Sequence, residues 1–235
     1  EQFTLGNMSN ALNELSESKS YVIDLRDNGG GLTSVAVDIA DNFIGEAVVE
    51  MHLYTGSVDT FKTKNDDKEI KKPIVVLMNE KTASASEILS SLLKQYGSDV
   101  TLVGATTLGK GIFQGDAKLS DGGKLHYTAG YYTVGDMECY QGIGIEPDVE
   151  VKMDSTLIGT DDDIQLKKAI EILENKTDSF VPDRTSHGII HFIYIFSLQK
   201  VSSLSLTVQD TDNIHQCTFS GTGLTDDGDK FSLID

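Results

Sequence analysis

Ser84 is the residue whose position most favours nucleophilic chemistry. It stands in the small-residue stretch TASAS at 82–86, which follows an apolar run at 73–78 and precedes a helical pattern. A serine in such a loop can project its hydroxyl into a cleft, with the N–H of Ala85 beside it. A serine directly before a helix is ordinarily an N-cap, and we expect Ser86 to take that role. Ser84 is therefore the candidate nucleophile.

A nucleophilic serine needs a base, and the histidines do not supply an obvious one. None of the five histidines lies in a glycine loop or at a strand end, although spacing alone cannot exclude a Ser-His-Asp arrangement. Lys110 is the alternative, because it stands between two glycines after the apolar run at 100–103. Burial beside Ser84 would disfavour its ammonium form and leave an amine able to take the serine proton. Considered alone, it is equally a lysine in a flexible turn.

A third loop has the glycines that let a ligand approach the backbone. The sequence NGGG at 28–31 follows the apolar run at 21–25. Consecutive glycines adopt positive φ without strain and leave their N–H groups accessible. The ordinary interpretation is a tight turn, but the same N–H groups could stabilise an oxyanion.

The three loops share one context, in which an apolar strand pattern precedes each loop. If the strands are parallel neighbours, their carboxyl ends place all three loops at one edge of a sheet. Helical patterns lie between and after them, so the sequence predicts an α/β fold. The expected strands are 21–25, 73–78, 100–103, 124–133, 148–152, 188–196, 203–209 and 215–220, with a hairpin at 47–63; the expected helices are 8–17, 33–44, 87–96 and 163–174.

Composition narrows the possible functions. The 235 residues are 39 % hydrophobic and 24 % charged, as in ordinary globular proteins. The net charge of −18 argues against binding nucleic acid or an anionic membrane surface. Cys139 and Cys217 have no zinc-ligand spacing, and they permit at most one disulfide. The longest apolar run, 188–196, is too short to span a bilayer.

Six stretches follow one another in a recognisable order: DLRDNGGG (24–31), NEKTASASEI (79–88), GATTLGKGIFQ (104–114), DGGKL (121–125), YYTVGD (131–136) and GIGIEPD (142–148). Together they resemble one family, the C-terminal processing peptidases, which are tail-specific serine proteases of peptidase family S41 with a Ser–Lys dyad. The resemblance covers roughly residues 1–175.

The resemblance implies a role for each candidate residue. Ser84 would be the nucleophile and Lys110 its general base, while Gln114, expected one helical turn past Lys110, would position the lysine. The oxyanion hole would be the N–H of Ala85 together with that of Gly30 or Gly31. The implied fold is an α/β core of the ClpP/crotonase type, with a parallel-strand sheet and flanking helices. The implied chemistry needs no metal or cofactor, and the substrates would be proteins or peptides, often cut near apolar C-terminal tails.

The same resemblance suggests how the chain is organised. Residues 1–177 would form the catalytic core, N-terminally incomplete and without a PDZ domain, and residues 178–235 a β-rich extension of unknown role. A regulatory PDZ or N-terminal domain would lie outside this chain, and a homo-oligomer is possible. The family implies action outside the cytoplasm, in the periplasm or cell envelope, although the sequence contains no signal peptide.

Two other functions compete with a serine endopeptidase. One is a non-catalytic relative that binds peptides in the same cleft, against which the retained Ser84, Lys110 and Gln114 argue. The other is an acyl-CoA enzyme, because the crotonase-type fold shares the double oxyanion hole. The glycine loops have no acidic pair beside them, and a Ser–Lys dyad would be idle in such an enzyme.

Overall fold

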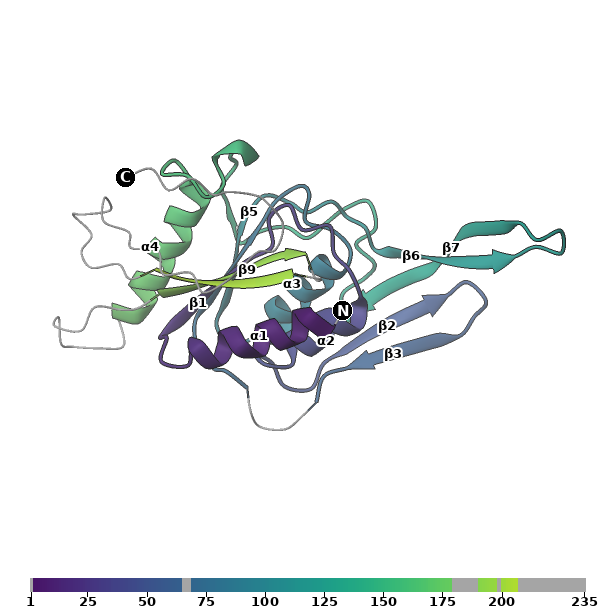
Figure 1. The fold of residues 1–235 in the computed structure, drawn as a ribbon, viewed down its shortest axis with the longest axis horizontal. Coiled ribbons are helices and arrows are strands. Elements are labelled where there is room, and N and C mark those ends of the chain that lie inside the picture. The colour runs from purple at the N-terminus through teal and green to yellow at the C-terminus, as the bar shows by residue number, and fades with distance from the viewer. Residues whose placement is uncertain (1, 65–68, 179–189, 198–199, 207–235) are drawn as a thin grey trace.

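A computed structural model describes residues 2–64, 69–178, 190–197 and 200–206. Two sheets and four α-helices make up these residues (Figure 1). In chain order the elements are α1 (Gln2–Glu14), β1 (Ser20–Asp24), α2 (Thr33–Ala40), β2 (Val48–Leu53), β3 (Val58–Lys62), β4 (Ile74–Met78), α3 (Ala85–Tyr96), β5 (Val100–Gly104), β6 (Ile112–Lys118), β7 (Lys124–Val134), β8 (Val149–Glu150), a 3₁₀ turn (Ser155–Leu157), α4 (Ile164–Asp178), β9 (Ile190–Ser197) and β10 (Lys200–Leu206).

The larger sheet positions the three loops that the sequence singled out. Its strand order is β10-β9-β1-β4-β5-β8, and every neighbouring pair except β10 and β9 is parallel. All five residues of β1 and of β4 are buried, as expected for parallel strands covered on both faces. Because β1, β4 and β5 are adjacent and parallel, their carboxyl ends lie at the same edge.

Alternate residues of these strands pack against different helices. Tyr21, Ile23 and Val76 belong to the large core that also contains the buried side chains of α1, α2 and α3. Val22 and Leu77 face the other way, into a smaller core that includes Ala169 and Leu173 of α4. Successive strand residues point to opposite faces, so α4 covers the face opposite the other three helices.

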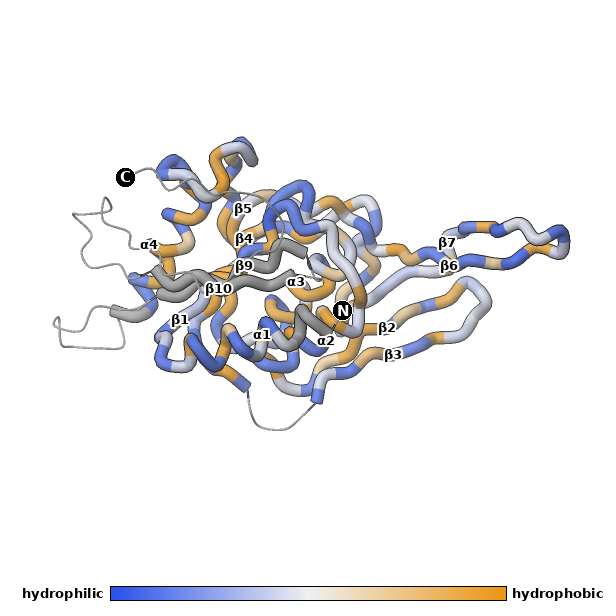
Figure 2. The backbone as a smooth tube through the Cα atoms, in the orientation of Figure 1, coloured by the Kyte–Doolittle hydropathy of each residue, from blue (hydrophilic) through white to orange (hydrophobic). Residues whose placement is uncertain are grey.

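The second sheet is antiparallel, with the strand order β3-β2-β7-β6. Figure 1 shows the hairpin of β6 and β7 extending away from the layered body. Hydrophobic residues are concentrated in the body, whereas the tip of this hairpin is mainly hydrophilic (Figure 2). Leu119, Leu125 and Tyr127 are exceptions, with roughly half of each side chain exposed on the hairpin.

A buried ion-pair network joins the loop after β1 to the start of α4. Arg26 contacts Asp24 at 2.6 Å and Asp163 at 2.8 Å, and its Nη1 also donates to Gln165. Burial alone would lower the pKa of Arg26, but the hydrogen bonds and charges of Asp24 and Asp163 raise it above its usual range. Asp163 also accepts the N–H of Leu166, so it caps the helix as well. The loop that carries the glycines is therefore tied to the start of α4.

The α/β fold with a parallel sheet and flanking helices, predicted from the sequence, is confirmed. The strand β6 was not predicted, and the strand expected at 203–209 overlaps β10 at Lys200–Leu206. The backbone of 190–197 pairs with β1, while the expected strand at 215–220 lies outside the described residues.

The division of the chain at residue 177 stays a prediction. No helix in the described part is long and apolar enough to cross a membrane.

Candidate active site

The loops after β1, β4 and β5 lie against one another. Ala83 N donates to Asn28 O at 3.0 Å, and the hydroxyl of Thr82 donates to Leu25 O at 2.8 Å. Leu108 N donates to Thr82 O at 3.0 Å, which ties the lysine loop to the serine loop. The structure therefore brings together the three loops in which the candidate nucleophile, base and oxyanion donors lie.

Asp27 and Asn79 add a reciprocal pair of hydrogen bonds between the first two loops. Asp27 N donates to Asn79 Oδ1 at 3.0 Å, and Asn79 Nδ2 donates to Asp27 Oδ1 at 2.9 Å. Lys81 lies 3.2 Å from the same Asp27 oxygen. Asn79 is buried, so these bonds fix the distance between the glycine loop and the serine loop.

Ser84 has an unusual backbone conformation. Its φ is 57° and its ψ is −122°, and Asp27 is the other non-glycine residue with positive φ in the described part of the chain. Such a conformation costs about 1–3 kcal/mol and persists where the surroundings impose it. A serine in a sharp turn between a strand and a helix presents its side chain outward, as nucleophilic serines on other folds do.

The helix after this turn begins two residues earlier than expected. Ser84, not Ser86, occupies the N-cap position of α3, so the prediction that Ser86 caps the helix was wrong. Ser86 is buried within the helix, and its hydroxyl has no hydrogen-bond partner among the described residues.

Gly30 touches the serine turn so closely that no side chain fits there. A Cβ built on Gly30 would lie 2.6 Å from Ala83 O and 2.9 Å from the Cβ of Ser84. Its φ of 94° also favours glycine. Gly29, one residue earlier, has nothing within 4 Å of such a Cβ.

We expect Gly30→Ala to destabilise the protein, whereas Gly29→Ala serves as the matched control. The added methyl group of Gly30→Ala meets backbone atoms and forces a strained φ, so the free energy of unfolding should fall by about 2 kcal/mol or more. Gly29→Ala should change it by less than about 0.5 kcal/mol. Urea unfolding of the two variants measures the difference, and equal stabilities would contradict the close approach.

Two of the three candidate oxyanion donors are available in the structure. Gly30 N donates to Asn28 Oδ1 at 3.0 Å, so this N–H is engaged. The N–H groups of Ala85 and Gly31 donate no hydrogen bond to any described residue. The geometry therefore favours Gly31 over Gly30 as the partner of Ala85.

A buried carboxylate lies beneath the serine and lysine loops. Glu87 Oε2 accepts from Ser84 N at 2.7 Å and from Lys110 N at 2.8 Å. Its Oε1 accepts from the hydroxyl of Thr107 at 2.5 Å and from Gly109 N at 2.7 Å. Glu87 had no predicted role, although its position three residues after Ser84 is that of a capping box.

The charge of Glu87 also affects a neighbouring phenol. Tyr140 is buried, and its hydroxyl has no hydrogen-bond partner among the described residues. Burial raises the pKa of Tyr140, and the negative charge of Glu87 raises it further. The buried part of the site therefore contains the carboxylate of Glu87 and the neutral phenol of Tyr140.

The Lys110 side chain is partly exposed, and its amine forms no hydrogen bond or ion pair with any described residue. The Ser84 side chain takes part in the capping box that begins α3, where it faces the backbone N–H of Glu87. The backbone at Lys110 is nevertheless fixed, because Gly111 N donates to Gln141 Oε1 at 2.9 Å and Gly109 O accepts from Gly142 N at 2.8 Å.

Gln114 does not lie one helical turn from Lys110, and this part of the prediction was wrong. It lies on β6, is exposed, and pairs with Thr128 of β7 next to a register shift. Pairing with β7 extends the chain, and four extended residues span roughly 13 Å. A role for Gln114 in positioning the lysine stays a prediction.

The described residues contain no group of three or more metal-ligating side chains. Cys139 is a free thiol whose sulfur lies 3.6 Å from Gly111 O, and Cys217 lies outside the described residues.

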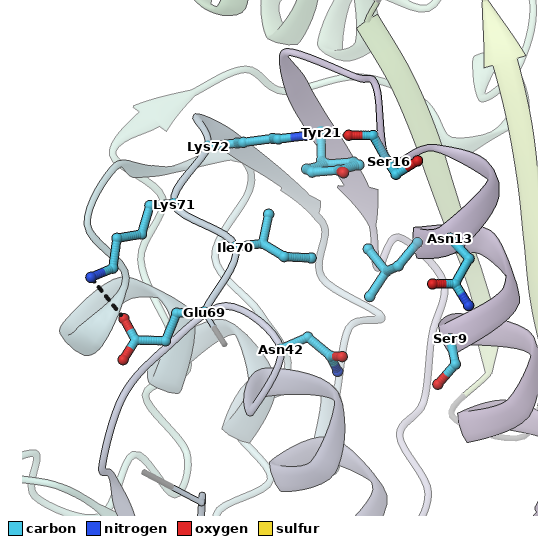
Figure 3. A pocket seen from close by; sticks show the side chains of 10 residues that line it. Ser9, Asn13, Ser16, Tyr21, Asn42, Glu69, Ile70, Lys71 and Lys72 are labelled. Carbon is cyan, nitrogen blue, oxygen red and sulfur yellow. Dashed lines mark hydrogen bonds and ion pairs between the residues drawn. The ribbon is translucent and has the colours of Figure 1, made fainter. Parts of the chain in front are cut away.

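A pocket of about 550 Å³ lies elsewhere, between α1, the end of α2 and the segment before β4 (Figure 3). Lys71 and Glu69 form an ion pair at its rim, and the amine of Lys72 donates to Ser16 O. None of the candidate site residues lines it. Its lining residues are Ser9, Leu12, Asn13, Ser16, Tyr21, Asn42, Glu69, Ile70, Lys71 and Lys72.

A protein-family model described as peptidase family S41 matches residues 1–151. The chain belongs to this family, as the sequence motifs predicted. It is 35 % identical over 175 residues to the carboxyl-terminal-processing protease of Synechocystis, covering 71 % of this chain and 40 % of the relative. It is 34 % identical over 154 residues to the carboxy-terminal processing protease CtpA of Bacillus subtilis, covering 64 % of this chain and 33 % of the relative.

The fold agrees with a solved structure of the same kind. The photosystem II D1 C-terminal processing protease superposes with a TM-score of 0.60 at 31 % sequence identity, covering 72 % of this chain and 43 % of that chain. The chain thus spans less than half the length of these relatives. All three relatives are described as C-terminal processing proteases.

Proposed function

We propose that this chain carries the catalytic site of a serine endopeptidase that cleaves protein substrates, with Ser84 as nucleophile and Lys110 as general base. The observation that best supports this proposal is the strained turn at Ser84, between β4 and α3. This turn packs closely against Gly30, and the carboxylate of Glu87 joins it to the Lys110 loop. The names of the relatives favour cleavage near C-terminal tails.

The proposed mechanism uses groups of this chain alone. A neutral Lys110 amine takes the proton of Ser84 Oγ as that oxygen attacks the peptide carbonyl, and an acyl-enzyme forms. The N–H groups of Ala85 and Gly31 hold the oxyanion, and loss of one such donor typically lowers kcat about 10²–10³-fold. The protonated amine then gives its proton to the leaving nitrogen, and water hydrolyses the ester by the reverse sequence.

The side chains of the dyad must approach each other before the reaction. Since their backbone nitrogens bind the same Glu87 oxygen, the two nitrogens cannot be farther apart than the sum of two hydrogen-bond lengths. We propose that rotation of the Lys110 side chain, without movement of its loop, closes the dyad when substrate enters. Catalytic hydrogen bonds are often open in the absence of substrate and tighten in the complex.

Trapping of the acyl-enzyme on the 235-residue chain tests this function. The protein is mixed with an activated ester of a short apolar peptide and quenched in acid, and its intact mass and peptide map are measured. We expect an acyl adduct on the peptide that contains Ser84, removable by hydroxylamine. Binding of the peptide without acylation would support the non-catalytic relative instead, and an adduct on another residue would overturn the assignment.

On the basis of the family we further propose a regulatory PDZ or N-terminal domain outside this chain, a homo-oligomer, and action in the periplasm or cell envelope. Secretion of the full-length gene product, followed by cell fractionation, tests the location.

A further inference from the structure

Glu87 has more hydrogen bonds than a helix cap requires. Each of its two oxygens accepts from two donors, and the carboxylate is fully buried. One donor, Ser84 N, comes from its own helix start. The other three, from Thr107, Gly109 and Lys110, lie 20 to 23 residues further along the chain. A capping role accounts for the first bond and leaves the other three unexplained.

Three features compensate for the burial of this carboxylate without a cation. A buried carboxylate is costly unless donors replace its water, and four donors do so here. Hydrogen bonds to an ionised acceptor are short, and the observed distances of 2.5–2.8 Å agree with this. Glu87 also lies in the first turn of α3, where the helix dipole favours negative charge. Among the described residues no Lys, Arg or His forms an ion pair with it.

On the basis of the proposed Ser–Lys mechanism, we propose that Glu87 is the positioning residue that assembles the dyad. Its Oε2 fixes the backbone nitrogens of Ser84 and Lys110 relative to each other, and its Oε1 holds the loop that leads to Lys110. The long lysine side chain starts from that backbone, so a displaced loop moves the amine away from the serine hydroxyl. Glu87 touches neither substrate nor reacting atoms in this mechanism, and it acts through Ser84 and Lys110.

The same carboxylate also helps to retain the strained turn. Ser84 adopts positive φ at a cost, and its N–H binds the carboxylate at 2.7 Å. Release of this bond would let the turn relax and change the direction of the hydroxyl. A displacement of about 1 Å in a reacting group is enough to lower a rate about 100-fold.

Glu87→Gln tests the proposal with almost no change of shape. In either orientation of the amide, one oxygen position becomes an NH₂ group that faces two donors. We expect kcat for peptide hydrolysis to fall about 100-fold while KM changes less than about threefold, because the substrate contacts are intact. Glu80→Gln is the matched control, since it makes the same change on an exposed side chain of the preceding turn and should leave kcat unchanged.

Amide hydrogen exchange gives a readout that does not depend on activity. In Glu87→Gln the peptides spanning Ser84 and 109–110 should exchange at least about tenfold faster than in the wild type, with β1 and β4 unchanged. Unchanged kcat with unchanged exchange would overturn the positioning role while leaving the proposed function standing. A wild type that forms no acyl-enzyme would instead contradict the proposed function, and the exchange comparison would still decide the role of Glu87.

A milder variant covers the case in which Glu87→Gln does not fold. Thr107→Val removes one donor to Oε1 and should lower kcat about tenfold, whereas Thr107→Ser keeps the hydroxyl and should restore it. Wild-type kcat in Thr107→Val would contradict the proposal.

Discussion

Replacement of Ser84 by alanine is expected to reduce peptide-bond hydrolysis at least about 10⁴-fold, to the level left by oxyanion stabilisation and binding alone. Alanine keeps the Cβ of Ser84, so the strained turn and its contact with Gly30 are retained while the nucleophile is removed. Substrate affinity should remain near that of the wild type. Initial rates on an unfolded protein with an apolar tail, together with binding measured by fluorescence anisotropy, check both parts.

Ser86→Ala is the matched control for this prediction. It removes a hydroxyl from the same loop-to-helix region, but that hydroxyl is buried and has no partner among the described residues. Its loss breaks no hydrogen bond, and kcat should stay within about twofold of the wild type. If Ser84→Ala kept more than a few per cent of the wild-type rate, Ser84 would not be the nucleophile. The same conclusion would follow if Ser86→Ala lost as much activity as Ser84→Ala.

The sequence was sufficient to predict the sheet edge at which the site lies. The apolar runs at 21–25 and 73–78 have no polar alternation, which is typical of parallel strands buried on both faces, and both are central strands of the larger sheet. Parallel order then brings their loops together without further information. The choice of Ser86 as the helix cap was wrong, because both serines precede the same helical pattern and the helix begins after Ser84.

Two features depended on contacts between distant segments, and the sequence did not reveal them. The spacing of Gln114 from Lys110 fits a helical turn, yet pairing of 112–118 with β7 makes this segment a strand. Glu87 has the spacing of a cap, but three of its four donors come from a loop that only the adjacency of β4 and β5 brings near. Sequence patterns predict which local structures can form, whereas pairing between distant strands decides which of these structures does form.

Lys110→Met is expected to lower kcat about 10²–10⁴-fold, the usual contribution of a general base. Methionine has nearly the length and shape of lysine, and the bond from Lys110 N to Glu87 involves the backbone, so the loop should keep its position. Acylation by a peptide ester should slow together with peptide hydrolysis, because both need the serine proton removed. Rapid-quench measurement of acyl-enzyme formation separates this step from deacylation.

Lys110→Arg distinguishes a base from a mere positive charge. Arginine keeps the charge but does not lose its proton in proteins, so it cannot accept one from Ser84. We expect Lys110→Arg to be as inactive as Lys110→Met, while Lys118→Met, on an exposed residue at the end of β6, should keep wild-type rates. Activity in the arginine variant would mean that the residue acts through its charge, and another group would then have to take the proton.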